Sequence, residues 1–241
     1  MLEGLYSAAA GMAAQQQRMD TLANDVANVN TTGYKHTRVA FRDLLYARDR
    51  TGVVSSGAGA AATPIGRGFA QGSLRETGNP LDVAIQGDGF LQVRRADGTT
   101  ALTRDGALRL DPRGRLSTQR GELVQPAVTV PAGTSDADVA IASDGTVSAA
   151  GRAVGRIQLV TVRAPQALQS AGDNLFVPTA GSGAPQAMRN GVVAQGSLEA
   201  SNVDLADAMT EMMDSQRSFQ MASKAVQMQD QILQIANEVK A

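Results

Sequence analysis

Apolar residues recur every seven positions along the first 29 residues of the chain. A seven-residue repeat places apolar side chains on one face of a helix, so it predicts a helix over Leu2–Val29 that packs in a coiled coil. The repeat consists of Leu5, Met12, Met19 and Val26, with Leu2, Ala9, Gln16 and Ala23 at the positions between them. The remaining faces carry Gln, Asn, Ser and Ala more often than charge, so we expect much of this helix to be covered.

The C-terminal segment has the same seven-residue period and a second apolar stripe. The period predicts a helix over Val203–Val239, about 55 Å long at 1.5 Å per residue, with Ser201 or Asn202 capping its start. The first stripe is Leu205, Met212, Phe219, Val226 and Leu233, followed at three residues by Ala208, Ser215, Ala222, Gln229 and Ala236. The second is Met221, Ala225, Met228, Ile232, Ile235 and Val239. Apolar residues on two faces require more than one packing partner.

A run of small polar residues ends the N-terminal pattern. Asn28, Asn30, Thr31 and Thr32 precede Gly33, which is the candidate for a left-handed helix cap because glycine adopts positive φ without strain. Tyr34 then begins a non-helical path.

Closely spaced turn signals dominate the middle of the chain. Short alternating runs between turns are typical of an all-β sandwich or barrel-like domain. The turns are Asp88-Gly89, Asp97-Gly98, Asp105-Gly106, Pro112-Arg113-Gly114, Arg120-Gly121 and Asp144-Gly145, and the runs start at Phe90, Ala107, Ala127 and Arg156.

Two features border this domain. The five residues AQGSL occur at 70–74 and again at 194–198, and we expect the two copies to lie together where the chain enters and leaves the domain. Residues 47–68 are rich in Gly, Ala and Ser, which predicts a flexible arm or a long hairpin.

The resulting expectation is an α+β protein, with long N- and C-terminal helices packed as a coiled coil and an inserted all-β domain of short antiparallel strands. The boundaries follow the changes in pattern. They are 1–33 for the first helix, 34–78 for a connecting arm or hairpin, 79–191 for the outer β domain, 192–202 for a return connector and 203–241 for the second helix.

Composition narrows the possible partners. A net charge of −1 gives no overall attraction to nucleic acid, and no apolar run is long enough to span a bilayer, so we expect neither nucleic-acid binding nor direct membrane insertion. The first 30 residues lack the basic and apolar regions of a cleaved signal peptide. With no Cys in the chain, disulfides and thiolate chemistry are excluded.

Catalytic and metal-binding patterns are weak. His36 is the one histidine, and we interpret it as a surface residue. The Asp residues of the middle domain lie beside Gly at turns, where Asp is favoured for backbone reasons. We therefore expect no catalytic residue, no metal and no cofactor.

Four linked segments resemble the flagellar rod and hook family of axial proteins. They are NDVANVNTTGYK from Asn24, NPLDVAIQGDGFLQV from Asn79, LTRDGALRLDPRGRLST from Leu102 and GSLEASNVDLADAM from Gly196. Within this family the resemblance points to the distal part of the rod, and a proximal rod subunit or a rod-like paralogue is the alternative. Leu91, Leu102 and Leu108 stand where the family pattern has aromatic residues, and residues 47–68 form a short arm.

The resemblance implies a structural subunit of the flagellar basal body, located in the cell envelope or periplasm and exported by the flagellar type III apparatus without a cleaved signal peptide. Its expected partners are further copies in a hollow helical tube, other rod and hook proteins, and ring or bushing proteins. Asn28, Asn30, Gly33 and Tyr34 belong to the family motif. A cell-envelope carbohydrate-binding module or hydrolase is the alternative from another class.

The expected subunit interface consists of the helix stripes. Its residues are Leu5, Met12, Gln16, Met19, Val26, Leu205, Met212, Phe219, Val226, Gln229 and Leu233. We expect Gln16 and Gln229 to fix the register, as buried amides do in coiled coils.

Overall fold

The chain folds into two compact units, each built from segments that are distant in sequence. A computed structural model describes residues 2–44, 47–48, 55–56, 59–188 and 190–240. Unit 1 comprises Met1–Ala27, Thr37–Ile65 and Asp204–Ala241, and unit 2 comprises Asn28–His36 and Gly66–Val203. The expected α+β class, with terminal helices and a β-rich middle, is confirmed.

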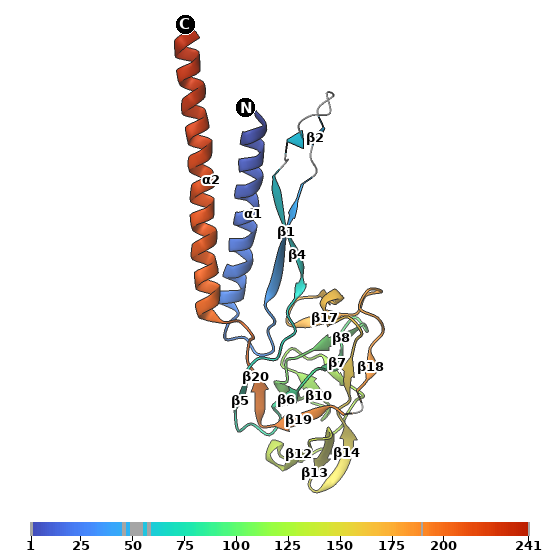
Figure 1. Cartoon of the computed structure of the whole chain (residues 1–241). Coiled ribbons are helices and arrows are strands. Elements are labelled where there is room, and N and C mark those ends of the chain that lie inside the picture. The colour runs from blue at the N-terminus through green and yellow to red at the C-terminus, as the bar shows by residue number, and fades with distance from the viewer. Residues whose placement is uncertain (1, 45–46, 49–54, 57–58, 189, 241) are drawn as a thin grey trace. The chain divides into compact units, whose positions relative to one another are not determined.

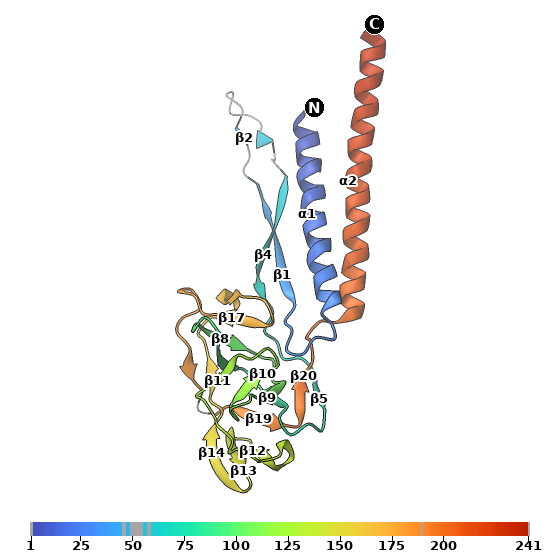
Figure 2. The same cartoon turned by 180° about the vertical axis from the view of Figure 1, so that it is seen from behind.

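Unit 1 is a pair of antiparallel helices with a β-hairpin beside the first. Helix α1 (Leu2–Ala27) and helix α2 (Leu205–Lys240) lie side by side in both views (Figure 1, Figure 2). Strands β1 (Thr37–Asp43) and β4 (Ala60–Arg67) pair as a hairpin, and β1 packs on α1. None of the described helices is sufficiently long and apolar to cross a membrane.

The hairpin corresponds to the predicted arm. Short strands β2 (Ala47–Arg48) and β3 (Ser55–Ser56) pair with each other beyond the ends of β1 and β4. The described part of this segment therefore consists of paired strands. Residues 45–46, 49–54 and 57–58, on which the prediction of flexibility partly falls, lie outside the described residues.

The first apolar stripe of α2 is its least exposed face. We call it the inner stripe, and it consists of Ala208, Met212, Ser215, Phe219, Ala222, Val226 and Gln229, all buried or half-buried. Helix α1 contacts α2, and Arg18 Nη2 lies 3.0 Å from Glu211 Oε2. The seven-residue period therefore identified the covered face of this helix from Ala208 onwards, but its first member, Leu205, is 43% exposed.

The buried face of α1 is rotated from the expected one. Ala14 and Asp25 are the buried residues, whereas Gln16 is exposed and donates a hydrogen bond to Asp20 at 3.0 Å. Ala9 and Ala23 are exposed as well, so the intermediate positions of the predicted stripe do not face the helix pair. Both carboxylate oxygens of Asp25 accept from Thr37 N, the first residue of β1, at 3.2 Å, so at this position the buried face is directed at the hairpin.

Both predicted helix ends were wrong in detail. Helix α1 ends at Ala27, six residues before Gly33, so Gly33 does not cap it, although its φ is +65°. At α2, Asp204 is the N-cap, since its Oδ1 accepts from Ala206 N at 2.8 Å and Asp207 N at 3.2 Å. Neither Ser201 nor Asn202 is the cap. Ser201 Oγ accepts from Val203 N, which lies before the helix, and the side chain of Asn202 is bonded elsewhere, as described below.

Unit 2 is built almost entirely from short antiparallel strands. The largest sheet has the order β16-β17-β8-β7-β11-β10-β9, with β15 also pairing with β7 and with β18. Its strands are β7 (Phe90–Arg94), β8 (Thr100–Thr103), β9 (Leu108–Leu110), β10 (Leu116–Thr118), β11 (Leu123–Gln125), β15 (Leu159–Thr161), β16 (Gln169–Ser170), β17 (Leu175–Val177) and β18 (Gln186–Ala187).

Smaller sheets complete unit 2. A three-stranded sheet has the order β12-β13-β14, and two pairs are β19-β6 and β20-β5. The strands are β5 (Leu74–Glu76), β6 (Val83–Gln86), β12 (Val139–Ile141), β13 (Thr146–Ala149), β14 (Arg152–Arg156), β19 (Val192–Gln195) and β20 (Ser197–Glu199). Two short 3-10 helices lie at Asp136–Asp138 and Pro165–Ala167.

The core of unit 2 is aliphatic, with one small aromatic cluster. The aliphatic part includes Val83, Leu91, Val93, Leu108 and Val147, each at most 1% exposed. In the aromatic cluster, the ring of Phe69 stands edge-on to those of Phe90 and Phe176, with centroids 5.3 and 5.1 Å away.

All six predicted turns connect strands, but one predicted strand is wrong. Residues from Ala127 form only an isolated bridge at Thr129, although Val128 and Val130 are buried. Pro126 and Pro131 flank this segment and lack amide protons, so it cannot extend a ladder. In the run from Arg156, Arg156 is the last residue of β14 and a separate strand begins at Leu159.

The two AQGSL copies lie together, as expected. In the β5–β20 pair, Leu74 is opposite Glu199 and Leu198 is opposite Arg75. The glutamine of each copy bonds backbone groups through both ends of its amide. Gln71 bonds Ile85 O and Gly87 N, and Gln195 bonds Pro80 O, Val139 O and Ile141 N, at 2.8–3.0 Å.

Candidate functional site

A buried cluster of three charged side chains lies in unit 2, near the points where the chain leaves that unit. Glu199 Oε1 accepts a hydrogen bond from Lys35 Nζ at 2.6 Å, and Glu199 Oε2 accepts one from Arg104 Nη1 at 3.2 Å. The side chains of Lys35 and Glu199 are fully buried, and that of Arg104 is 2% exposed. One carboxylate therefore compensates two buried cations.

Backbone groups satisfy most of the remaining hydrogen-bonding capacity of the cluster. Gly72 N donates to Glu199 Oε1 at 2.9 Å, Lys35 Nζ donates to Ala70 O at 2.7 Å, and Arg104 Nη1 donates to Gly87 O at 2.9 Å. Such bonds are required because buried charge without partners is strongly unfavourable. Arg104 Nε has no hydrogen-bond partner among the described residues, and the guanidinium lies 5.2 Å from the centre of the Phe90 ring.

Burial lowers the pKa of Lys35, and the Glu199 carboxylate opposes that shift by hydrogen bonding and by charge. Arg104 lowers the pKa further through like-charge repulsion. The charged state of Lys35 in this apolar surrounding thus depends on Glu199.

Asn202, three residues after Glu199, makes further hydrogen bonds beside the ion cluster. We call this region, where the chain segments of unit 2 begin and end, the junction. Its Nδ2 donates to Gly68 O at 2.7 Å and to Ala70 O at 3.0 Å, and its Oδ1 accepts from His36 N at 2.8 Å. Together with Glu199, it joins the end of Asn28–His36, the start of Gly66–Val203 and the end of that segment. Three of the four places where the chain passes between the units are thereby held together within unit 2.

Gly33 and Gly68 are required by the close packing at this junction. Gly33 N donates to Glu199 O at 2.8 Å, and a Cβ at this position would lie 2.6 Å from Asp105 N. A Cβ on Gly68 would lie 2.1 Å from His36 Cε1. His36 is therefore half-buried against Gly68, and its interpretation as a surface residue was wrong.

The sequence motifs identified this region but not its chemistry. Gly33 and Tyr34 are buried here, while Asn28 accepts a turn bond from Thr31 N and Asn30 is exposed. Lys35, Arg104, Glu199 and Asn202 were not among the expected site residues. The available signal was that Lys35, Arg104 and Glu199, which carry opposite charges, occur in three separate family motifs.

The expected interface residues lie on the helices of unit 1. Met12, Met19, Val26, Met212, Phe219, Val226 and Gln229 are half-buried, and Gln16 and Leu205 are exposed. Leu5 and Leu233 lie outside the residues whose side chains are described.

A second face of α2 is exposed and apolar. We call it the outer stripe, and it consists of Met209, Met213, Met221, Met228, Ile232 and Ile235, which are 52–66% exposed. It includes most of the second stripe seen in the sequence. An apolar row of this length on one face of a helix is typical of a packing surface.

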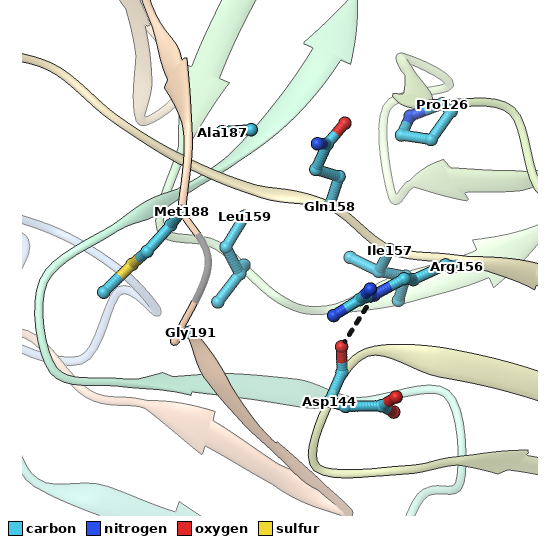
Figure 3. A pocket seen from close by; sticks show the side chains of 9 residues that line it. All are labelled: Pro126, Asp144, Arg156, Ile157, Gln158, Leu159, Ala187, Met188 and Gly191. Carbon is cyan, nitrogen blue, oxygen red and sulfur yellow. Dashed lines mark hydrogen bonds between the residues drawn. The ribbon is translucent and has the colours of Figure 1, made fainter.

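A pocket in unit 2 shows no catalytic arrangement among its described lining residues. It has a volume of about 490 Å³ and is lined by residues that include Ile157, Leu159 and Met188, with Asp144 and Arg156 as its charged groups (Figure 3). Both carboxylate oxygens of Asp144 accept hydrogen bonds from Thr146, which lower its pKa. Arg156 Nε donates to Asp144 O at 3.0 Å. Among the lining residues that the structure describes, no nucleophile is paired with a base.

In the part of the chain that the structure describes, no group of three or more His, Cys, Asp or Glu side chains could hold a metal ion.

Comparison with known families gives three matches along the chain. Residues 5–35 match the flagella basal body rod protein family, residues 84–149 match the flagellar hook protein FlgE/F/G D1 domain, and residues 194–239 match the flagellar basal body rod FlgEFG protein C-terminal family. Each matched segment contributes one member of the ion cluster, namely Lys35, Arg104 and Glu199 respectively.

Full-length relatives agree with these matches. The chain is 38% identical to the flagellar basal-body rod protein FlgG of Borreliella burgdorferi, over 100% of this chain and 99% of the relative. It is 36% identical to FlgG of Caulobacter vibrioides over the whole of both chains. It is 33% identical to the rod protein FlgF of Salmonella typhimurium, over 99% and 98% of the two chains.

The first prediction concerns Glu199. Glu199→Gln leaves two buried cations without a counter-ion, so the free energy of unfolding of the β unit should fall by about 3–5 kcal/mol, measured by urea denaturation. Glu76 lies on the strand paired with β20 and is exposed. The control variant Glu76→Gln should therefore change the free energy of unfolding by less than about 0.5 kcal/mol. The triple variant Lys35→Met, Arg104→Met, Glu199→Leu should be more stable than Glu199→Gln alone, because it removes the charges together. Equal stability of Glu199→Gln and the wild type would contradict this account.

The second prediction concerns pH. Burial raises the pKa of Asp105 above its ordinary value of 3.8, with repulsion from Asp82 as a smaller cause. The folded state then binds this proton more tightly than the unfolded state, so the contribution of Asp105 to stability falls as pH rises from 3.8 through its raised pKa. Asp105→Asn should therefore be more stable than the wild type at pH 7, and the difference should shrink as pH approaches 4. Asn can keep both bonds, since Thr32 Oγ1 and Ala107 N donate to the same oxygen.

Asp111→Asn provides the control with the opposite sign. Hydrogen bonds from Arg115 lower the pKa of Asp111, so this variant should lose stability at pH 7 and approach the wild type in acid. Urea denaturation from pH 4 to pH 8 measures both variants, and the same pH trend for the two would refute the assignment.

Proposed function

The chain belongs to the flagellar basal-body rod protein family, and from this premise we propose that it polymerises helically into a hollow axial tube through the apolar stripes of its terminal helices. As a rod protein it is a structural subunit rather than an enzyme. We place it in the distal rod, in the cell envelope or periplasm, in contact with further copies and with other rod and hook proteins. In this proposal it reaches that place through the type III export apparatus.

The observation that carries the proposal is the outer stripe of α2. The inner stripe is already buried or half-buried within a single chain, whereas Met221, Met228 and Ile232 are 66%, 58% and 58% exposed. Burying apolar side chains of this size stabilises an assembly by about 1.5–3 kcal/mol each. Neighbouring copies of a tube, related by one repeated operation, supply such a contact without a dedicated partner.

Coiled-coil packing of α1 and α2 is part of the same proposal. The seven-residue spacing of Met12, Met19 and Val26 supports it, as does the matching period of the inner stripe. In the tube, Leu5 and Leu233 would continue these rows, and the exposed Gln16 would meet a neighbouring subunit.

A rod that transmits torque needs subunits whose chain segments are stiffly connected to one another. The Glu199 cluster and Asn202 supply such a connection within unit 2, because they join chain segments 95 and 164 residues apart through buried charged groups.

The test is concentration-dependent assembly. The purified protein should form tubes visible by electron microscopy, and its helix content by circular dichroism should rise from the dilute monomer to the polymer, because α2 gains packing partners. A dilute monomer with the full helix content of the polymer, and no tendency to polymerise, would count against the proposal.

The third prediction concerns the outer stripe. Met221→Glu with Ile232→Glu places two charges on this face, so tubes should be lost while the urea denaturation of unit 2 stays unchanged. Gln216→Glu adds a charge to an exposed position outside the stripe and should polymerise as the wild type does. Normal assembly of the double variant, measured by sedimentation, would exclude the stripe as a contact.

The fourth prediction concerns register. Gln229→Leu should increase the number of tube forms seen by electron microscopy before it changes stability, because a buried amide favours one alignment of helices over its alternatives. Gln231→Leu, at a neighbouring exposed position, is the control. A single unchanged tube form would contradict a role of Gln229 in register.

A further inference from the structure

Four of the exposed large apolar side chains on the described part of α2 are methionines. Met209, Met213, Met221 and Met228 are 54%, 52%, 66% and 58% exposed, and all belong to the outer stripe. The other described methionines, Met12, Met19, Met188 and Met212, are half-buried. Among the described methionines, the thioethers that are most open to a small oxidant therefore all lie on the outer stripe of α2.

The composition of the chain concentrates oxidation on these residues. The sequence contains no Cys and no Trp among its 241 residues, so methionine supplies all of its sulfur. Susceptibility of a sulfur to oxidation follows its exposure. No thiol competes with the outer stripe for a peroxide.

We propose that Met209, Met213, Met221 and Met228 form a reversible oxidation site that determines whether the outer stripe can pack against a neighbouring subunit. The inference rests on the proposed function, in which this stripe is buried between subunits. A peroxide is the oxidant. Its O–O bond breaks, one oxygen bonds to the methionine sulfur, and the other leaves as water, or as an alcohol from an alkyl peroxide. The sulfur is oxidised by two electrons and the peroxide is reduced by two.

The product changes the chemistry of the stripe. A sulfoxide is polar and accepts hydrogen bonds, whereas the thioether is apolar and flexible. An acceptor buried between apolar helix faces finds no donor, and this opposes burial. Oxidation therefore prevents the free subunit from polymerising. In the assembled subunit the methionine sulfurs are covered, so they are protected from the peroxide. Reductases specific for methionine sulfoxide restore the thioether.

The experiment treats the full-length protein with dilute hydrogen peroxide, once as the free subunit and once as the polymer. Mass spectrometry of its peptides follows each methionine. In the free subunit, the four outer-stripe methionines should oxidise severalfold faster than Met188 and Met212, and polymerisation should slow this reaction severalfold. Oxidised subunits should need a protein concentration at least about tenfold higher to polymerise, and treatment with both types of sulfoxide reductase should reverse this change.

A variant separates oxidation from structural damage. Leucine has nearly the volume of methionine and no sulfur, so the quadruple variant M209L/M213L/M221L/M228L should polymerise normally and become insensitive to peroxide. The matched control, M188L/M212L, keeps the outer stripe and should remain sensitive.

The outcomes distinguish this inference from the proposed function. If unoxidised protein polymerises but its oxidised form polymerises equally well, or if the quadruple variant stays sensitive, the oxidation site is refuted and the proposed function stands. If unoxidised protein does not polymerise at any accessible concentration, the proposed function fails and this inference fails with it.

Discussion

The compensation of two buried cations by the carboxylate of Glu199 is the constraint on which unit 2 depends. Lys35, Arg104 and Glu199 come from three distant parts of the chain, and none of them can be buried alone without a large penalty. Unit 2 can therefore close only when all three segments are in place. Glu199 is also the partner of Leu74 in the β5–β20 ladder, and its carbonyl oxygen accepts a hydrogen bond from Gly33 N. Glu199 thus takes part in charge compensation, in strand pairing and in the backbone hydrogen bond to Gly33.

Unit 1 follows a different principle, because its packing is apolar and incomplete within one chain. Helix α2 buries its inner stripe and leaves the outer stripe in solvent, as it would if a neighbouring subunit were to cover the second face. Met side chains suit such a surface, since they adapt to several packing geometries. Their sulfur also makes the surface open to oxidation, and this links assembly to the chemical environment of the free subunit.

Several residues show why the expected site differed from the observed one. A period of seven identifies a covered helix face, and this succeeded for Ala208 and Ser215 on α2. It failed for the intermediate positions of α1. Among the described residues of this helix, the small Ala14 and the hydrogen-bonded Asp25 are buried instead, because hydrophobicity alone does not identify small or satisfied polar residues as buried. Asn202 resembled a helix cap because the helix begins nearby, yet its amide is bonded to His36, Gly68 and Ala70. Short-range patterns contain no information about such long-range partners.

The sequence by itself determined the two helices, the strand-rich middle with its turns, and the family. These features arise from local periodicity, turn chemistry and motif order, all of which a linear chain displays. Only the tertiary structure decided that Lys35, Arg104 and Glu199 form one ion cluster, that His36 is packed on Gly68, and which face of α1 is buried. The physical reason is that burial and charge compensation depend on the three-dimensional neighbours of a side chain, and those neighbours are up to 164 residues away.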